Sequence, residues 1–156
     1  MSKSLKRVTR ALLDAGLEPD IREMSDSTRT AAEAAAAVGC ELDQIVKSII
    51  FAGTESGTIH LFLTAGGNQV DPAKATQAAG EPLRRADAAE IRAKTGFAIG
   101  GVAPLGHLTP APAYFDPRLS DFIEIWAAAG TPRHVFAISP AKLLHLTGAQ
   151  PTDFTS

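Results

Sequence analysis

The sequence contains one cysteine and no long apolar run, so it has little from which to build disulfides, thiolate metal clusters or membrane spans. Its 156 residues include a single cysteine, Cys40, so an intramolecular disulfide and a thiolate cluster are both excluded. Its apolar runs are well short of the roughly 20 residues that span a bilayer, and no apolar signal core follows the basic N-terminus. We interpret Cys40 as a small packing residue, because no acid/base pattern surrounds it. A lone thiol fits the reducing cytoplasm, where we expect the protein to act.

The sequence also has no excess of positive charge. Lys and Arg number 15 against 17 Asp and Glu, so the net charge is -2 with neutral histidines. Proteins that hold nucleic acid by bulk charge are normally basic, so wide contact with a nucleic acid is disfavoured. Hydrophobic residues make up 45% and charged residues 21% of the chain, which is typical of a folded globular protein rather than a disordered one. We expect a single domain over residues 1–156.

Hydrophobic periodicity and capping residues predict helices intermixed with strands. The predicted helices are 4–15, 30–38, 71–79, 87–96 and 139–147. The predicted strands are 19–24, 45–52, 58–65, 83–85, one that starts at Phe97, 122–128 and 134–138. A regular strand–helix–strand repeat is absent. We therefore expect an α+β fold with one mixed, strongly curved and barrel-like sheet surrounded by peripheral helices.

The first predicted helix carries positive charge on one face. Lys3, Lys6, Arg7 and Arg10 fall together there, away from the apolar positions that should face the core. This basic stripe is either a solvated helix face or a surface that steers phosphate groups toward the protein.

Lys47 is unusual because it lies in a predicted strand whose two faces both look buried. The side chains of Lys47 and Ser48 point to opposite faces of the strand 45–52, among Ile, Val and Phe. A buried ammonium group is costly unless it is paired or reaches water. Lys47 therefore either extends to a sheet edge or an internal carboxylate, or lies at the mouth of a pocket whose anionic ligand supplies the opposite charge.

A glycine-rich loop, Gly100-Gly101-Val102-Ala103-Pro104-Leu105-Gly106-His107, follows the strand expected at Phe97. It is neither a Walker loop nor a dinucleotide fingerprint, because the required lysine and glycine spacing are missing. Paired glycines let a ligand approach the main chain, whose N–H groups can hold an anion or polarise a carbonyl. Pro104 would limit the freedom of the loop. The alternative is a turn that only reverses the chain.

The histidines do not form a metal-binding pattern. The H-E-x-x-H arrangement is absent, and one cysteine cannot complete a zinc set, so we expect neither a metal nor another cofactor. His107 borders the glycine loop and His134 begins a strand after Gly130, and each is either a site residue or a structural histidine. His60 and His145 are assigned no role. Because no nucleophile elbow or Ser-His-Asp set is present, a hydrolase built on this chain need not form a covalent intermediate.

Three segments together resemble the YbaK/ProX family, which is similar to the editing domain inserted into bacterial prolyl-tRNA synthetases. The first two are Val46-Lys47-Ser48-Ile49-Ile50-Phe51 and Gly100-Gly101-Val102-Ala103-Pro104-Leu105-Gly106. The third is Ala128-Ala129-Gly130, a strand, and Ser139-Pro140-Ala141-Lys142-Leu143. The resemblance covers roughly residues 25–148, and the joint order of the segments is more specific than any one of them.

The resemblance implies a free-standing trans-editing factor, a deacylase that hydrolyses the ester joining a wrong amino acid to tRNA. By position, Lys47 matches the family lysine that contacts the 3′-terminal nucleotide. Gly100, Gly101 and Pro104 match the loop that binds near the scissile carbonyl and positions water. The remaining positions expected to bind substrate are Ser48, Gly106, His107, Gly130 and His134. The mechanism that follows is direct attack of water, with a ribose hydroxyl of the tRNA assisting proton transfer.

The resemblance narrows the substrate only in part. Cysteine-specific relatives tend to have a serine where this chain has Ala128, and alanine-specific relatives carry a histidine just after the glycine that corresponds to Gly130. We expect a small or polar amino acid on the 3′ end of a tRNA, with tRNA-Pro as one carrier, prolyl-tRNA synthetase as one partner and no membrane. The alternative is a non-catalytic module that binds aminoacyl-tRNA or a synthetase. A weaker one is a small-molecule binding protein that reuses the fold.

Overall fold

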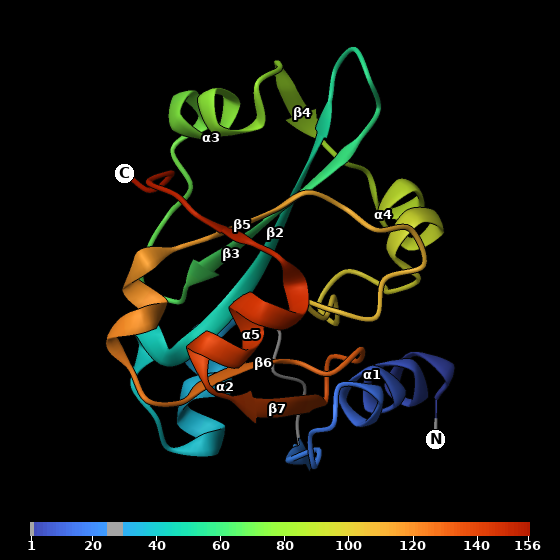
Figure 1. The fold of residues 1–156 in the computed structure, drawn as a ribbon, viewed down its shortest axis with the longest axis vertical. Coiled ribbons are helices and arrows are strands. Elements are labelled where there is room, and N and C mark those ends of the chain that lie inside the picture. The colour runs from blue at the N-terminus through green and yellow to red at the C-terminus, as the bar shows by residue number, and fades with distance from the viewer. Residues whose placement is uncertain (1, 25–29) are drawn as a thin grey trace.

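The computed structural model describes residues 2–24 and 30–156, and one mixed β-sheet runs through it (Figure 1). Its strands are β1 Ile21–Glu23, β2 Ile45–Gly53, β3 Ile59–Ala65, β4 Leu83–Arg85, β5 Ala113–Phe115, β6 Ile125–Ala128, β7 His134–Ile138 and β8 Gln150–Pro151. The α-helices are α1 Lys3–Asp14, α2 Ala31–Val38, α3 Pro72–Ala79, α4 Ala88–Thr95 and α5 Pro140–Thr147. Two short 3-10 helices are η1 Leu42–Gln44 and η2 Pro117–Asp121. Within the described residues, no helix is both long and apolar enough to cross a membrane.

The strand order β1-β7-β6-β2-β3-β5-β8 places the β2–β3 hairpin at the centre of the sheet, with β4 paired to the far end of β2. The hairpin is antiparallel, and Lys47 lies opposite Thr64. β6 pairs with β2 in parallel, as β5 does with β3. The predicted α+β class with one mixed sheet is therefore confirmed. Among the described residues β1 and β8 do not pair with each other, so the sheet stays open at these two edges.

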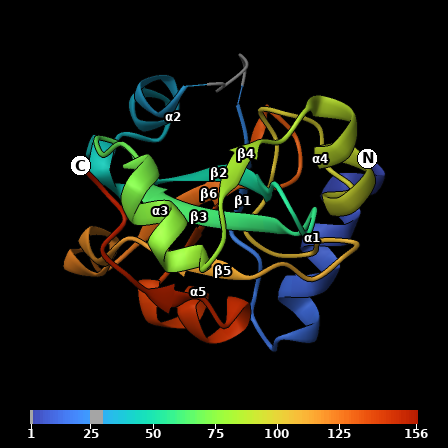
Figure 2. The ribbon, with the colours of Figure 1, turned by 90° about the horizontal axis from the view of Figure 1, so that it is seen from above.

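Helices cover both faces of the sheet (Figure 2). The largest core cluster joins the apolar sides of α1, α4 and α5 to one face, with Val8, Ile91 and Leu143 among its buried residues. On the other face α2 packs over Trp126, and α3 packs near an aromatic group around Phe62. The alanine-rich α2 buries Ala34 and Ala35 against this face, because small side chains allow close approach.

The five predicted helices are confirmed to within one residue at each end. Their starts follow from local chemistry, since each N-cap side chain accepts a hydrogen bond from the first turn, at Thr30, Asp71, Asp87 and Ser139. The predicted hairpin and the strand over residues 134–138 are confirmed as well.

In the second half of the chain one strand prediction is wrong and another is confirmed only in part. The strand expected to start at Phe97 is wrong, because this residue is fully buried in the main core and enters a loop rather than a ladder. The strand expected over 122–128 begins only at Ile125, after η2. Conversely, β5 was missed because prolines at 110, 112 and 117 made the segment resemble a connection.

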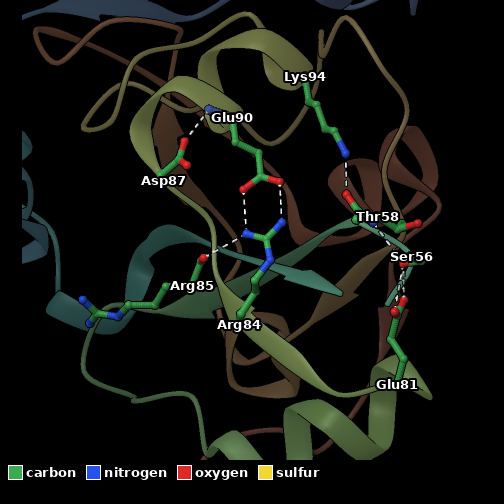
Figure 3. A network of polar contacts seen from close by, with 9 residues as sticks. Ser56, Thr58, Glu81, Arg84, Arg85, Asp87, Glu90 and Lys94 are labelled. Atoms are coloured by element: carbon green, nitrogen blue, oxygen red, sulfur yellow. Dashed lines mark hydrogen bonds and ion pairs between the residues drawn. The ribbon is translucent and has the colours of Figure 1, made fainter. Parts of the chain in front are cut away.

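Polar contacts tie α4 to the hairpin and to β4 (Figure 3). The Arg84 guanidinium donates to both carboxylate oxygens of Glu90, each at 2.8 Å. The Lys94 ammonium donates to the carbonyl of Gly57 in the hairpin turn. These contacts hold α4 against β4 and the hairpin turn.

We predict that Phe154→Ala lowers the free energy of unfolding by about 3–5 kcal/mol, as large-to-small core changes do. Phe154 is fully buried, and its ring packs edge-on against that of Phe62 with 5.1 Å between the ring centroids. Chemical denaturation measures the effect. Ile123→Ala is the control, because Ile123 is 93% exposed and its truncation should change stability by no more than about 0.5 kcal/mol. Equal losses in the two variants would contradict the packing role of Phe154.

Candidate functional site

A cavity of about 760 Å³ opens between α2, the first half of β2, β6 and the segment after α4. This size is typical of a small-molecule site. Its wall is mostly apolar and includes Ala34, Ile45, Ile99, Trp126, Ala127 and Val135. Its polar side chains are those of Thr30, Lys47 and Ser48, and the main chain of Gly66 and Gly100 also lines it.

Lys47 lies half-buried on β2 at this cavity. Its ammonium group donates to the main-chain oxygen of Asn68 at 2.5 Å. Burial lowers the pKa of Lys47, while the negative charges of Asp116 and Asp43 act in the opposite direction. The lysine is near internal carboxylates and also lines a cavity, so both interpretations of the sequence stay open.

Asp116 organises the chain around Lys47. Its carboxylate is 2% exposed and accepts hydrogen bonds from the N–H of Ala65 at 3.0 Å, the amide of Asn68 at 2.9 Å and the N–H of Arg118 at 3.0 Å. It thereby fixes the residue whose carbonyl receives the Lys47 ammonium. This role was not predictable from the sequence, because Asn68 and Asp116 are 48 positions apart.

Asp43 places a second negative charge near the lysine. It accepts from the N–H of Gly67 at 2.8 Å and from the Arg118 guanidinium at 2.9 Å. The hydrogen bond from Arg118 is the main cause that lowers the pKa of Asp43. Arg118 also donates to Asp121 at 2.9 Å. Asp43 was not among the sequence candidates either, since its arginine partner lies 75 positions away.

The glycine-rich loop approaches the cavity through Gly100, whose φ of 92° lies in the left-handed region. Gly101 is buried against Thr131, and a Cβ at this position would lie 2.7 Å from the Thr131 Cα. The Gly101 N–H donates to the carbonyl of Ala98 at 3.0 Å. A contact from this N–H to a substrate would therefore have to share or replace that bond.

Neither candidate histidine lines the cavity wall, since His107 ends the glycine-rich loop and His134 begins β7. The His107 ring donates through Nε2 to the carbonyl of Ala103 at 2.6 Å and lies edge-on to Phe97. Burial, and to a smaller extent the nearby charge of Arg7, lowers the pKa of His107, which keeps the ring neutral near pH 7. His134 is hydrogen-bonded through Nδ1 to the Thr131 hydroxyl at 2.6 Å.

The structure thus brings together only some of the predicted site residues. Lys47, Ser48 and Gly100 line the cavity. The others do not line it and instead shape or support the adjacent loops, namely Gly101, Pro104, Gly106, His107, Gly130 and His134. Their direct contacts with a substrate stay predictions. Trp126 and Ala127 also line the cavity but were not predicted as site residues. Both lie in the predicted strand 122–128, which the structure pairs with β2.

The groups in the cavity limit its chemistry. In the part of the chain that the structure describes, no group of three or more His, Cys, Asp or Glu side chains is placed to hold a metal ion. Cys40 packs beside the α2 core cluster, and burial raises the pKa of its thiol, which agrees with a packing role. The hydroxyls of Thr30 and Ser48 have no histidine beside them in the cavity wall. Among the described residues, the wall therefore offers one ammonium group as a partner for an anion, and two hydroxyls with no histidine in the same wall.

Arg7 does not belong to the solvated part of the basic stripe. Its guanidinium donates from Nε to the carbonyl of Gly106 and from Nη2 to the carbonyl of Gly96, each at 2.8 Å. Lys3, Lys6 and Arg10 remain exposed, with Arg10 paired to Asp14 at 3.1 Å. The predicted stripe is therefore reduced to three surface cations.

Comparison with known proteins gives one family and several relatives. The family described as the aminoacyl-tRNA editing domain matches residues 25–146. The uncharacterized protein YwhH of Bacillus subtilis is 31% identical over 140 residues, covering 90% of this chain and 88% of that protein. EbsC of Enterococcus faecalis, named as a candidate Cys-tRNA(Pro)/Cys-tRNA(Cys) deacylase, is 24% identical over 133 residues, covering 85% and 80%.

A solved structure resembles this chain along its whole length. It is described as a candidate trans-editing enzyme for prolyl tRNA synthetase. The two chains are 52% identical and superpose with a TM-score of 0.93, over 100% of this chain and 99% of the other.

We predict that Asp43→Asn lowers the pKa of Lys47 further, because it removes a negative charge that acts to raise that pKa. The asparagine oxygen can still accept from the N–H of Gly67, so the local turn should persist. A carbon-detected NMR titration of the Lys47 side chain measures the shift. Asp121→Asn removes the other carboxylate on Arg118 and should leave the Lys47 pKa almost unchanged. A rise of this pKa in Asp43→Asn would be incompatible with the assignment.

Proposed function

The chain belongs to the aminoacyl-tRNA editing domain family, and from that premise we propose that it is a trans-editing aminoacyl-tRNA deacylase. In this proposal it hydrolyses the ester that joins a small or polar amino acid to the 3′ end of a mischarged tRNA. The observation that carries the proposal is the half-buried ammonium of Lys47 in a cavity that Gly100 also lines. The site of action would be the cytoplasm.

In this proposal Lys47 binds the terminal nucleotide of the tRNA. An ammonium group is a compact point charge that binds phosphate oxygens. Because burial has already removed part of its hydration and lowered its pKa, an incoming anion restores the balance of charge and favours the protonated lysine. The carbonyl of Asn68 holds the ammonium in place meanwhile. This role needs only the 3′ end of the tRNA, which fits a chain without a basic excess.

In this proposal the glycine-rich loop binds and orients the reacting ester. Main-chain N–H groups close to Gly100 would polarise the ester carbonyl and stabilise the oxyanion that forms when water attacks. The water oxygen forms a bond to the carbonyl carbon, and the ester bond to the ribose oxygen then breaks. The proton released by water reaches that ribose oxygen, with the neighbouring ribose hydroxyl as the relay. The products are the free amino acid and a tRNA with a free terminal hydroxyl.

The descriptions of the relatives support a narrower choice of the tRNA to test first. The solved relative is described in relation to prolyl tRNA synthetase, and the Enterococcus relative is named for Cys-tRNA(Pro) and Cys-tRNA(Cys). We therefore propose tRNA-Pro as the first carrier to test and prolyl-tRNA synthetase as the partner to test by pull-down. The apolar wall formed by Ile45, Trp126 and Ala127 would receive the amino-acid side chain.

A non-catalytic aminoacyl-tRNA or synthetase-binding module is the second candidate. It is favoured by one observation, that among the described residues no histidine lines the cavity with the two hydroxyl groups. Direct attack of water on an oriented ester does not require such a pair, so we give hydrolysis first place. A deacylation time course on a panel of mischarged tRNAs separates the two. Binding without hydrolysis of any member would assign the module role.

We predict that Lys47→Ala reduces kcat/KM for deacylation by about 10- to 100-fold, the cost of losing a hydrogen bond to a charged group. Circular dichroism should show that the variant stays folded. Lys74→Ala is a matched control, because Lys74 also donates to a main-chain oxygen, that of Thr155 at 2.8 Å, and pairs with Asp153. This residue does not line the cavity. Unchanged activity in Lys47→Ala would remove the lysine from the mechanism.

We predict that the double substitution Lys3→Gln/Lys6→Gln weakens tRNA binding and flattens its dependence on salt. Each lost phosphate contact should reduce the slope of log K against log salt by about 0.7–0.9. Lys142→Gln removes an exposed lysine from another helix, α5, and controls for net charge. If the double variant and the control behave alike, the remaining stripe is only a solvated helix face.

A further inference from the structure

We propose that Arg7 of α1 is a positioning residue that holds the glycine loop at the cavity. The proposal rests on the proposed function, since it concerns the loop assigned to the ester. The Arg7 side chain donates at once to the carbonyls of Gly96 and Gly106, which lie before and after the loop segment that includes Gly100. One side chain from the start of the sequence thus binds both ends of a loop 89 to 99 positions away.

Main-chain hydrogen bonds close the loop at its neck. The N–H groups of Leu108 and Thr109 donate to the carbonyls of Thr95 and Lys94, at 3.1 and 2.9 Å. These bonds set the distance between the loop ends. They lie at the neck of the loop. Arg7 adds contacts from a different element and fixes the loop against α1.

Gly96 shows that the arrangement is built around the guanidinium. It ends α4 with a φ of 83°, so its carbonyl belongs to the helix C-terminus, where cations are favoured. A Cβ at Gly96 would lie 2.3 Å from Nη2 of Arg7. The Arg7 guanidinium also lies over the Phe97 ring, 4.6 Å from its centroid. A planar fork with several donors can satisfy all these contacts together, whereas a lysine ammonium cannot.

The same helix supports the opposite side of the loop. Gly130 packs against the start of α1, where a Cβ would lie 2.7 Å from the carbonyl oxygen of Ser4. The next residue, Thr131, packs against Gly101. Two chains of contact therefore run from α1 to the loop, one through Arg7 to its ends and one through Gly130 and Thr131 to Gly101. Because α1 precedes residue 25, it lies outside the range that matches the editing family.

The expected consequence is catalytic rather than a loss of binding. A group that orients a reacting carbonyl must be held to well within 1 Å, and a misplacement of about 1 Å can cost roughly 100-fold in rate. Most of the cavity wall around Lys47 belongs to α2, β2 and β6 and should be unaffected. Loss of Arg7 should therefore lower kcat and leave KM nearly unchanged.

The test compares Arg7→Ala and Arg7→Lys with Arg84→Ala by steady-state deacylation well below the unfolding midpoint. We expect kcat to fall by about 10- to 100-fold in Arg7→Ala, with partial retention in Arg7→Lys. Guanidinium ion at a non-denaturing concentration should restore part of the activity of Arg7→Ala. Arg84→Ala removes an arginine of equal size that makes two hydrogen bonds to Glu90 away from the loop (Figure 3), and it should keep the wild-type kcat.

Amide hydrogen exchange on the same variants provides a readout that does not depend on activity. In Arg7→Ala, exchange should accelerate in residues 97–107 and stay slow in β2 and β3. Wild-type loop exchange in this variant, or acceleration spread evenly over the sheet, would overturn the proposal. If the wild-type protein hydrolyses no mischarged tRNA, the proposed function fails, and loop exchange still decides whether Arg7 positions the loop.

Discussion

A charged lysine held half-buried in the central hairpin is the constraint on which the site depends. Its ammonium is balanced by one carbonyl, that of Asn68, and by the negative charges of Asp116 and Asp43. Asp116 is also the acceptor for the N–H of Ala65 at the end of β3. The balance is incomplete, because burial still lowers the pKa of Lys47. In the proposed function, an anionic ligand would complete this balance.

The two halves of the site are held in different ways. The lysine side is built into the sheet, where paired strands fix each position. The loop side contains glycines with left-handed φ values at 96, 100 and 106, so its own backbone preferences do not specify one shape. Its geometry comes instead from Arg7, His107 and Thr131, which contact it from outside or brace it from within.

The sequence predicted the features that depend on neighbours in the chain. Thr30 with Glu33, and Asp71 with Pro72, mark helix starts through local hydrogen bonds. Lys47 was identified because alternation showed a charge with buried positions on both faces. The partners of that charge were not predictable, because Asn68 and Asp116 meet only in the folded chain.

Aromatic content and proline content misled the strand predictions. Phe97 is strand-like by type, yet it packs under the Arg7 guanidinium and beside His107 in the main core. The segment before Asp116 is rich in proline, yet three of its residues pair with β3 as β5. In both places tertiary packing outweighed local preference. Arg7 itself lay on the predicted basic face, and only the folded loop shows why this one cation turns inward.

The bonds from Arg7 to Gly96 and Gly106 also bear on the order of folding. They close loops of 89 and 99 positions in the chain, and contacts of such separation carry a large entropic cost before they form. The β2–β3 hairpin joins near neighbours and can assemble early. The glycine-rich loop would then be among the last parts to take its final shape, after the cavity wall on β2 is already in place.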